Sequence, residues 1–320
     1  CSAEGKARHY DHEVKALTVV KPFVGVQRDV PADATVFLAH HDSMRGFVLS
    51  EGVHPFYSDI DTQAMAAAAV DEAVRRQVCA GARLDRIAVL DNFCGPDPEQ
   101  SEQAPDGAYK LAQLVRACRG LYETTVAYGT PLISGKDSMK NDSVMGGVKI
   151  SVPPTLLVSA IGTIDDVRTA VTLDFKCEGD VVFVLGTTAD EAGGSEWYRY
   201  LADRAGRSVE PGLPAPFVGT RPPRVDAERT VPLYRALNGA VQAGLVRSAA
   251  PHGDLVPGPR DPGLLLDDAV ESRLNDEFLD VIRCHGADRR ALLDVDEGTF
   301  SGDDDLFRLA HGRRFESDFH

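Results

Sequence analysis

A run of alanine and valine residues between Asp61 and Ala80 constrains the fold more than any other stretch of the sequence. Its apolar residues recur at every fourth position: Ala66, Val70, Val74 and Val78. This spacing predicts one apolar face on a helix, and the small alanine side chains let that helix approach its neighbour closely. Asp59 and Asp61 lie at its N-terminal end, where carboxylates accept hydrogen bonds from unpaired N–H groups, so we interpret them as capping residues.

Two pairs of opposite charge lie within the predicted helix. Glu72 is followed one turn later by Arg76, and Asp71 by Arg75. Side chains at this spacing meet on the surface of a helix. From the residues alone, we interpret both as ion pairs on the protein surface.

An apolar run, Ile87–Leu90, has the length of a buried strand and is followed by acidic and amide side chains. We predict that Asp91, Asn92, Asp97 and Glu99 lie in a loop, because prolines interrupt this stretch. Oxygen ligands at the end of a strand suit a hard cation such as Mg²⁺ that bridges nucleotide phosphates. The alternative is that the loop is acidic only because it is exposed to water.

The segment Ser-Gly-Lys-Asp-Ser, residues 134–138, follows a short apolar run. We predict a loop in which Gly135 lets the backbone turn and Lys136 offers a positive charge to a phosphate. Asp137 would face a metal ion, and Ser138 would donate a hydrogen bond. The segment is not a P-loop, because the first glycine and its spacer are missing.

The flanking segments predict a mixed sheet packed with helices. Strands are expected at 18–26, 34–38, 149–151 and 155–164, and a looser segment at 40–56. A second long helix is expected at 105–128. The residues expected to pack on the sheet are Leu111, Leu114, Val115, Cys118, Leu121, Tyr122 and Thr125. Together these elements predict an α+β fold.

The composition argues against several functional classes. A net charge of −15 disfavours a role on nucleic acid or at a membrane surface. No apolar run approaches the roughly 20 residues of a transmembrane helix. The 6 cysteines include no pair at Cys-x-x-Cys spacing, which is typical of free thiols in a reducing cytosol, so we expect a cytoplasmic protein.

Eight segments occur in an order that resembles phosphoribosylformylglycinamidine synthase, and more narrowly the second half of its synthetase region. They are Tyr10–Val14, Val19–Gly25, Pro31–Val36, Gly52–Asp61, Ala69–Arg75, Leu90–Cys94, Ser134–Asp142 and Pro153–Gly162. The resemblance is thinner from residue 180 onward and fades after about Ser248. It implies a two-domain architecture like that of aminoimidazole ribonucleotide synthetase, with mixed sheets packed with helices and an incomplete or divergent C-terminal domain.

The resemblance also implies an activity. In this family, Mg-ATP phosphorylates the amide oxygen of formylglycinamide ribonucleotide, and ammonia then displaces phosphate to give the amidine. Carried over to this chain, the metal ligands are Asp33, Glu72 and Asp91. The ATP or phosphate contacts are Gly135, Lys136, Asp137 and Ser138. No catalytic residue is assigned, because the segment that carries the family's catalytic histidine has no counterpart here. The expected partners are a first synthetase half, a glutaminase subunit or domain and a small-molecule nucleotide substrate.

The chain departs from the family pattern at two places that bear on the site. The family usually has an asparagine four residues after Glu72, whereas this chain has Arg76, a cation that should repel Mg²⁺ if it points into the site. After Ser248 the family continues with an Asp- and Gly-rich segment, which is replaced here by a proline-rich one, residues 250–260. Prolines fix φ and remove backbone donors, so this segment cannot form the same loop.

We predict three regions along the chain. A first α+β domain covers 1–168, a second, partial domain covers 169–249, and a divergent acidic tail covers 250–320, with a short helix expected at 264–282. The leading hypothesis is an incomplete part of the synthetase. The alternatives are a non-catalytic assembly subunit or a decayed remnant. A relative such as aminoimidazole ribonucleotide synthetase is a third, against which residues 10–14 and 134–139 argue.

Overall fold

The computed structural model describes residues 4–10, 12–186, 189, 191–204, 219–251 and 280–284. A six-stranded sheet forms its centre, in the order β1, β4, β5, β10, β6, β7. These strands are β1 (Thr18–Val20), β4 (Thr35–Leu38), β5 (Gly46–Val53), β10 (Thr155–Ile164), β6 (Ile87–Cys94) and β7 (Leu132–Ser138). Neighbouring strands run antiparallel, except that β6 and β7 are parallel.

Two strands lie where the sequence predicted loops. β5 falls within the segment 40–56 that we expected to be irregular, and it pairs along its whole length with β10. β7 contains the Ser-Gly-Lys-Asp-Ser segment, and β6 extends through Asp91 and Asn92. The loop predictions at these positions are therefore wrong, because pairing with neighbouring strands overrides the local glycine and polar signals.

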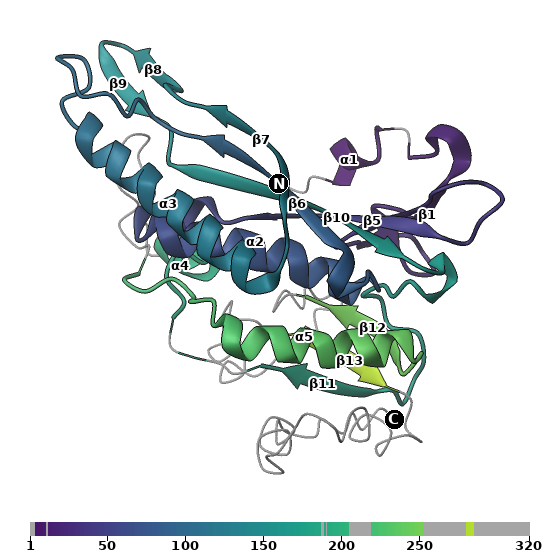
Figure 1. Cartoon of the computed structure of the whole chain (residues 1–320). Helices are drawn as coiled ribbons and strands as arrows, with labels where there is room; N and C mark the ends of the chain where they lie inside the picture. The colour runs from purple at the N-terminus through teal and green to yellow at the C-terminus, as the bar shows by residue number, and fades with distance from the viewer. Residues whose placement is uncertain are drawn as a thin grey trace.

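One face of the sheet is covered by α2 (Thr62–Cys79) and α3 (Gly107–Tyr128), as Figure 1 shows. The predicted apolar face of α2 is confirmed, since Ala66, Val70, Val74 and Val78 are all 0% exposed. α2 lies very close to β5. A Cβ added at Gly52 would sit 2.1 Å from the carbonyl oxygen of Ala69, so only glycine fits there. The Asp61 carboxylate caps α2 by accepting hydrogen bonds from the N–H groups of Gln63 and Ala64, as predicted.

The buried face of α3 matches the predicted one only in part, since Leu121 and Thr125 are buried as predicted. Leu111, Val115 and Tyr122 are exposed, and the inward side carries smaller residues such as Ala117 and Gly120. α3 packs against α2, with Gly120 over the backbone of Gln63: a Cβ on this glycine would meet the Gln63 carbonyl oxygen at 2.3 Å. Close helix contact therefore determines which face is buried, and the exposed apolar residues misled the prediction.

A second, three-stranded sheet has the order β11 (Val181–Leu185), β13 (Asp280–Cys284), β12 (Val246–Ala250). α5 (Ala227–Gln242) lies between this sheet and the helices of the first layer (Figure 1). The central strand β13 lies within the segment predicted as a tail. Its first three residues overlap the helix expected at 264–282, and the helix prediction is wrong for these residues. Residues 252–279 and 285–320 lie outside the described residues.

The remaining α-helices and strands of the described residues are short. They are α1 (Glu4–Ala7), β2 (Phe23–Val24), β3 (Val30–Pro31), β8 (Asp142–Met145), β9 (Val148–Ser151) and α4 (Glu196–Arg204). β8 and β9 form a hairpin that extends the chain beyond β7, and β9 corresponds to the strand predicted at 149–151. The predicted strand 155–164 coincides with β10.

A buried carboxylate joins α2, α3 and α5. Asp71, 0% exposed, pairs with Nη1 of Arg75 at 3.0 Å and accepts hydrogen bonds from the hydroxyls of Tyr128 on α3 and Tyr234 on α5, the latter at 2.9 Å. Burial, together with the charge of Asp71, raises the pKa of Tyr128, which keeps this hydroxyl protonated and able to donate. The prediction of a surface ion pair is thus correct in its partners and wrong in its location.

Replacing Asp71 by asparagine should strongly destabilise the protein. The substitution removes the carboxylate that pairs with the buried Arg75 guanidinium, and breaking a buried ion pair on one side costs about 3–5 kcal/mol. The free energy of unfolding in urea would measure this loss. Glu123→Gln is a matched control, because Glu123 forms the same one-turn pair with Arg119 on the exposed side of α3. Equal stability of D71N and E123Q would contradict the assigned role.

Candidate functional site

The Glu72 carboxylate lies beneath the end of β5 and is 6% exposed. Its Oε1 accepts a hydrogen bond from Nη2 of Arg76 at 2.8 Å. Its Oε2 accepts one from the backbone N–H of Val53 at 2.8 Å and lies 3.3 Å from Nε2 of His54. The His54 ring stacks on Tyr57 at 4.6 Å, which fixes its orientation. Both oxygens of this carboxylate are therefore held by groups of the chain itself.

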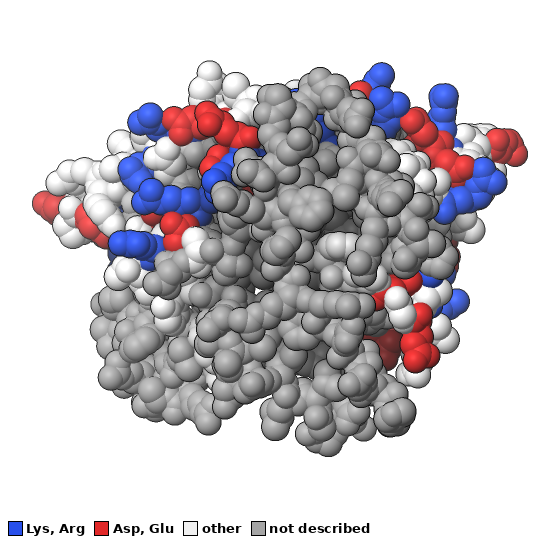
Figure 2. Space-filling model, turned by 90° about the horizontal axis from the view of Figure 1, so that it is seen from below, with Lys and Arg blue, Asp and Glu red and all other residues white. Residues whose placement is uncertain are grey.

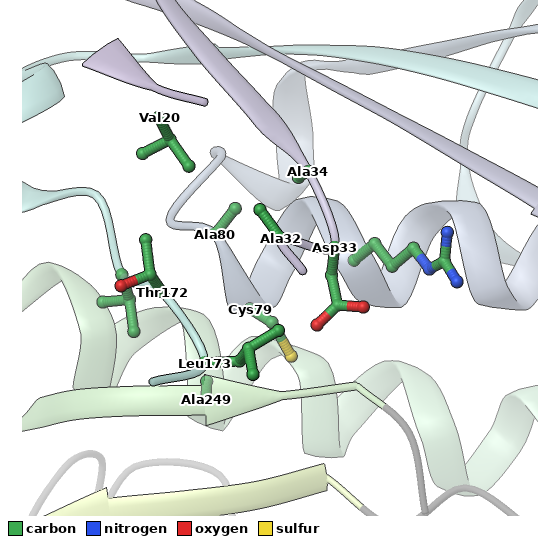
Figure 3. Close-up of a pocket in the computed structure, with 11 residues that line it drawn as sticks. Val20, Ala32, Asp33, Ala34, Cys79, Ala80, Thr172, Leu173 and Ala249 are labelled. Atoms are coloured by element: carbon green, nitrogen blue, oxygen red, sulfur yellow. The ribbon is translucent and has the colours of Figure 1, made fainter. Parts of the chain in front are cut away.

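Arg76 also lines a small pocket between the two sheets, with room for about one water molecule. The turn after β3 contributes Asp33, the end of α2 contributes Cys79, and β12 contributes Ala249. In Figure 3 the Asp33 carboxylate points toward the side of the pocket formed by Cys79 and Leu173. Asp33 and Arg76 are thus the charged residues that border a cavity otherwise lined mainly by small and apolar side chains.

Asp91 and Asp137 form a second acidic site, on the side of the sheet that faces α3. Successive side chains of a strand point to opposite faces, and Asp91 and Asp137 share the face of the buried residues Val89 and Phe93. Burial raises the pKa of Asp91, and the charge of Asp137 raises it further. Burial likewise raises the pKa of Cys118 on α3, with added contributions from both carboxylates.

Lys136 lies on the other face of β7. It is paired in register with Asn92 of β6, and the next residue along β6 on the same face toward its N-terminus is Leu90. The four residues predicted to contact phosphate therefore lie on two faces of the sheet. Lys136 and Ser138 share one face, and Gly135 and Asp137 share the other. The sequence prediction placed these side chains in one loop and missed the alternation that a strand imposes.

The three predicted metal ligands do not form one group. Asp33 borders the pocket, and Glu72 is held under β5. Asp91 on β6 is in register with Gly52 on β5 across the intervening strand β10, which separates the two positions by about 10 Å. Among the described residues, no cluster of three or more His, Cys, Asp and Glu side chains is arranged to hold a metal ion. These donors therefore do not fit a shared Mg²⁺ site in this arrangement.

The acidic loop after β6 is neutralised by nearby lysines. Lys140 pairs with Glu99 at 2.5 Å and lies 3.8 Å from Asp97, while Lys149 pairs with Asp142 at 3.2 Å. Positive and negative side chains also lie side by side where the described surface is visible in Figure 2. None of the helices in the described part of the chain has the length and apolar character required to cross a membrane.

The face of the six-stranded sheet opposite α2 and α3 carries apolar side chains on both sides of a central polar pair, Glu51 and Ser159, and bears no helix of the described chain except the short α1 nearby (Figure 1). We call it the open face. Its apolar side chains are Phe37, Phe47, Leu49, Val53, Leu90, Leu157 and Ile161. Leu49 and Val53 are each 42% exposed. Lys136 and Asn92 lie at one margin of this face.

Comparison with known proteins identifies relatives of the chain, although no family model matches it. The chain is 32% identical over 251 residues to phosphoribosylformylglycinamidine synthase subunit PurL of Methanocaldococcus jannaschii. The aligned segment covers 78% of this chain and 30% of that protein. Over this segment, the chain belongs to the PurL family.

A PurL subunit of Parasynechococcus marenigrum is 30% identical over 279 residues, which is 84% of this chain and 34% of that protein. The chain therefore spans about a third of the length of these curated PurL relatives.

Solved structures of PurL have the same fold. PurL of Thermotoga maritima in complex with AMPPCP superposes with a TM-score of 0.55 at 21% identity, over 89% of this chain and 39% of that one. The PurLQS structure from the same organism gives a TM-score of 0.54 at 20% identity, over 89% and 38%. The predicted α+β fold, like that of aminoimidazole ribonucleotide synthetase, is confirmed.

The assignment of Asp137 to the α3 side can be tested through Cys118. Asp137→Asn removes a negative charge that raises the pKa of this thiol, so the thiolate fraction at pH 8 should increase. We expect the Cys118 peptide to be alkylated by iodoacetamide about two- to fourfold faster, as measured by mass spectrometry.

Lys136→Gln is the matched control, because it changes the neighbouring residue on the opposite face of β7. Its effect on Cys118 should be much smaller than that of D137N. An unchanged alkylation rate in D137N would show that Asp137 points away from α3.

Proposed function

We propose that this chain forms part of the synthetase of phosphoribosylformylglycinamidine synthase, a ligase of de novo purine biosynthesis. In this proposal, ATP drives the conversion of formylglycinamide ribonucleotide to its amidine in the cytoplasm. The supporting observation is the 32% identity to PurL across 78% of the chain. Thermotoga maritima PurL has been solved in complex with AMPPCP and with FGAR, which favours ATP and this nucleotide as the ligands of the assembled site.

The open face supports the proposed first synthetase half as a partner. Exposed apolar strands on one side of a sheet are typical of a surface that another protein layer covers. Leu49 and Val53 lie on central strand β5 and are each 42% exposed, so a second sheet packed here would bury them. This chain would then be the second half of the synthetase, and a glutaminase subunit or domain would supply ammonia. The two halves would meet across this layer.

Phosphoryl transfer needs positioning and cationic charge more than a covalent nucleophile. Among the predicted site residues, Lys136 best supplies the cationic charge. It lies at the margin of the open face beside Asn92, so both side chains would meet a ligand held between the two halves. We propose that Lys136 and Ser138 contact phosphate there, and that Gly135 and Asp137 shape the strand behind them. Mg²⁺ would enter with ATP, and no step is assigned to it because the predicted ligands of this chain do not fit it jointly.

Turnover measurements test the assembly. The purified chain would be given formylglycinamide ribonucleotide, Mg-ATP and ammonium chloride, and substrate-dependent ADP release would be followed. Ammonium replaces the glutaminase. We expect no turnover by the chain alone and turnover after adding a chain that carries the first synthetase half. Turnover by the chain alone would contradict the proposal that it is one half of the synthetase. No turnover in either mixture would favour a non-catalytic assembly subunit or a remnant.

Lys136→Ala should weaken ATP binding to the assembled halves by about tenfold, because a phosphate loses one charged partner. Isothermal titration calorimetry would measure the dissociation constant. Lys140→Ala is the matched control: it removes a lysine four residues away whose charge is already paired with Glu99. Equal weakening by both variants would argue for a general charge effect and against a specific phosphate contact.

A further inference from the structure

The environment of Glu72 differs from that of a metal ligand. A carboxylate that binds Mg²⁺ must offer at least one oxygen lone pair to the ion, in a nearly octahedral arrangement with other oxygens. Here the Oε1 atom accepts a hydrogen bond from Arg76 at 2.8 Å, and Oε2 accepts one from the N–H of Val53 at 2.8 Å. His54 Nε2 lies 3.3 Å from Oε2. The donors around this carboxylate therefore come from the chain.

The position of Arg76 is fixed by the helix. Glu72 and Arg76 are one turn apart on α2, so their side chains lie on the same side of it. Arg76 is 24% exposed, and it also borders the pocket that contains Asp33. A guanidinium remains charged at any accessible pH. Arg76 therefore places a permanent positive charge beside Glu72, within hydrogen-bonding distance of one oxygen that an ion would use.

We propose that the Arg76 guanidinium takes the place of a divalent cation beside Glu72, so that this site binds no Mg²⁺ and carries a built-in positive charge. The net charge of this site would then be independent of the metal concentration. This inference does not depend on the proposed function, because it concerns metal binding by the chain itself.

Electrostatic repulsion between Arg76 and a bound cation supports this assignment. A cation coordinated by Glu72 Oε1 would lie on the same side of the carboxylate as the Arg76 nitrogen, and two positive charges at such a distance repel strongly in a partly buried site. Removing the guanidinium removes this repulsion. Asparagine at position 76 would, in addition, offer a carbonyl oxygen one turn from Glu72. Arg76→Asn is therefore expected to create a metal site from residues that now exclude one.

The test uses Mn²⁺ as the probe, with free Mn²⁺ measured by electron paramagnetic resonance. Wild type and E72Q should bind Mn²⁺ equally, because Glu72 is not a ligand in the wild type. R76N should bind one ion about tenfold or more tightly than any site of the wild type. The double variant R76N/E72Q should lose that gain. R119N is the matched control, since Arg119 forms the same one-turn pair with Glu123 on an exposed surface, and it should gain nothing.

Two results would overturn the proposal. One is weaker Mn²⁺ binding by E72Q than by wild type, which would make Glu72 a ligand in spite of Arg76. The other is a folded R76N variant that gains no more than R119N. If a variant fails to fold, iron-catalysed backbone cleavage of the wild-type chain gives the answer without substitutions: cleavage near Val53 and Glu72 would overturn the proposal, and its absence there, with cleavage elsewhere, would support it.

Discussion

The close contact between α2 and β5 is the constraint on which the rest of the structure depends. Gly52 leaves no room for a side chain above the Ala69 carbonyl, and the adjoining alanines keep the helix near the sheet. This approach brings Gln77 within hydrogen-bonding distance of the carbonyl oxygens of Val48 and Ala160 on two different strands. It also fixes the rotation of α2, which directs Asp71 toward α3 and α5 and Glu72 toward the end of β5. Structural and candidate functional residues therefore share one helix and one packing contact.

Much of the fold could be predicted from the sequence because several elements are strongly periodic. α2, α3 and β10 were predicted close to their observed limits, and the resemblance to the synthetase gave the correct architecture. β5 was missed because glycines at both ends and polar residues within it weaken the local strand signal, and its order comes from pairing with β10. β7 was predicted as a loop for the same reason. The buried face of α3 was assigned correctly only in part, because Val115 and Tyr122 are apolar yet exposed.

The candidate site was harder to predict than the fold. Sequence reasoning identified the ion-pair partners on α2, but it could not show that Asp71 is buried beneath two tyrosines contributed by distant helices. It grouped Lys136 with Asp137, since neighbours in a loop can converge on one ligand, whereas neighbours in a strand diverge. The departure from the expected family pattern at Arg76 was visible in the sequence. Its meaning depends on the contacts of Glu72 with Val53 and His54, which only the folded chain brings together.

The position of β10 has a consequence for how the chain folds. This strand pairs with β5 on one side and with β6 on the other, so it closes the centre of the sheet although it is the last of the six strands in the sequence. Until it has been synthesised, β5 and β6 lack the partner that lies between them, and their backbone edges stay open while α2 and α3 can already form by local contacts. Such distant pairings slow folding. During synthesis, the six-stranded sheet is therefore exposed to misassociation until residue 164 has left the ribosome.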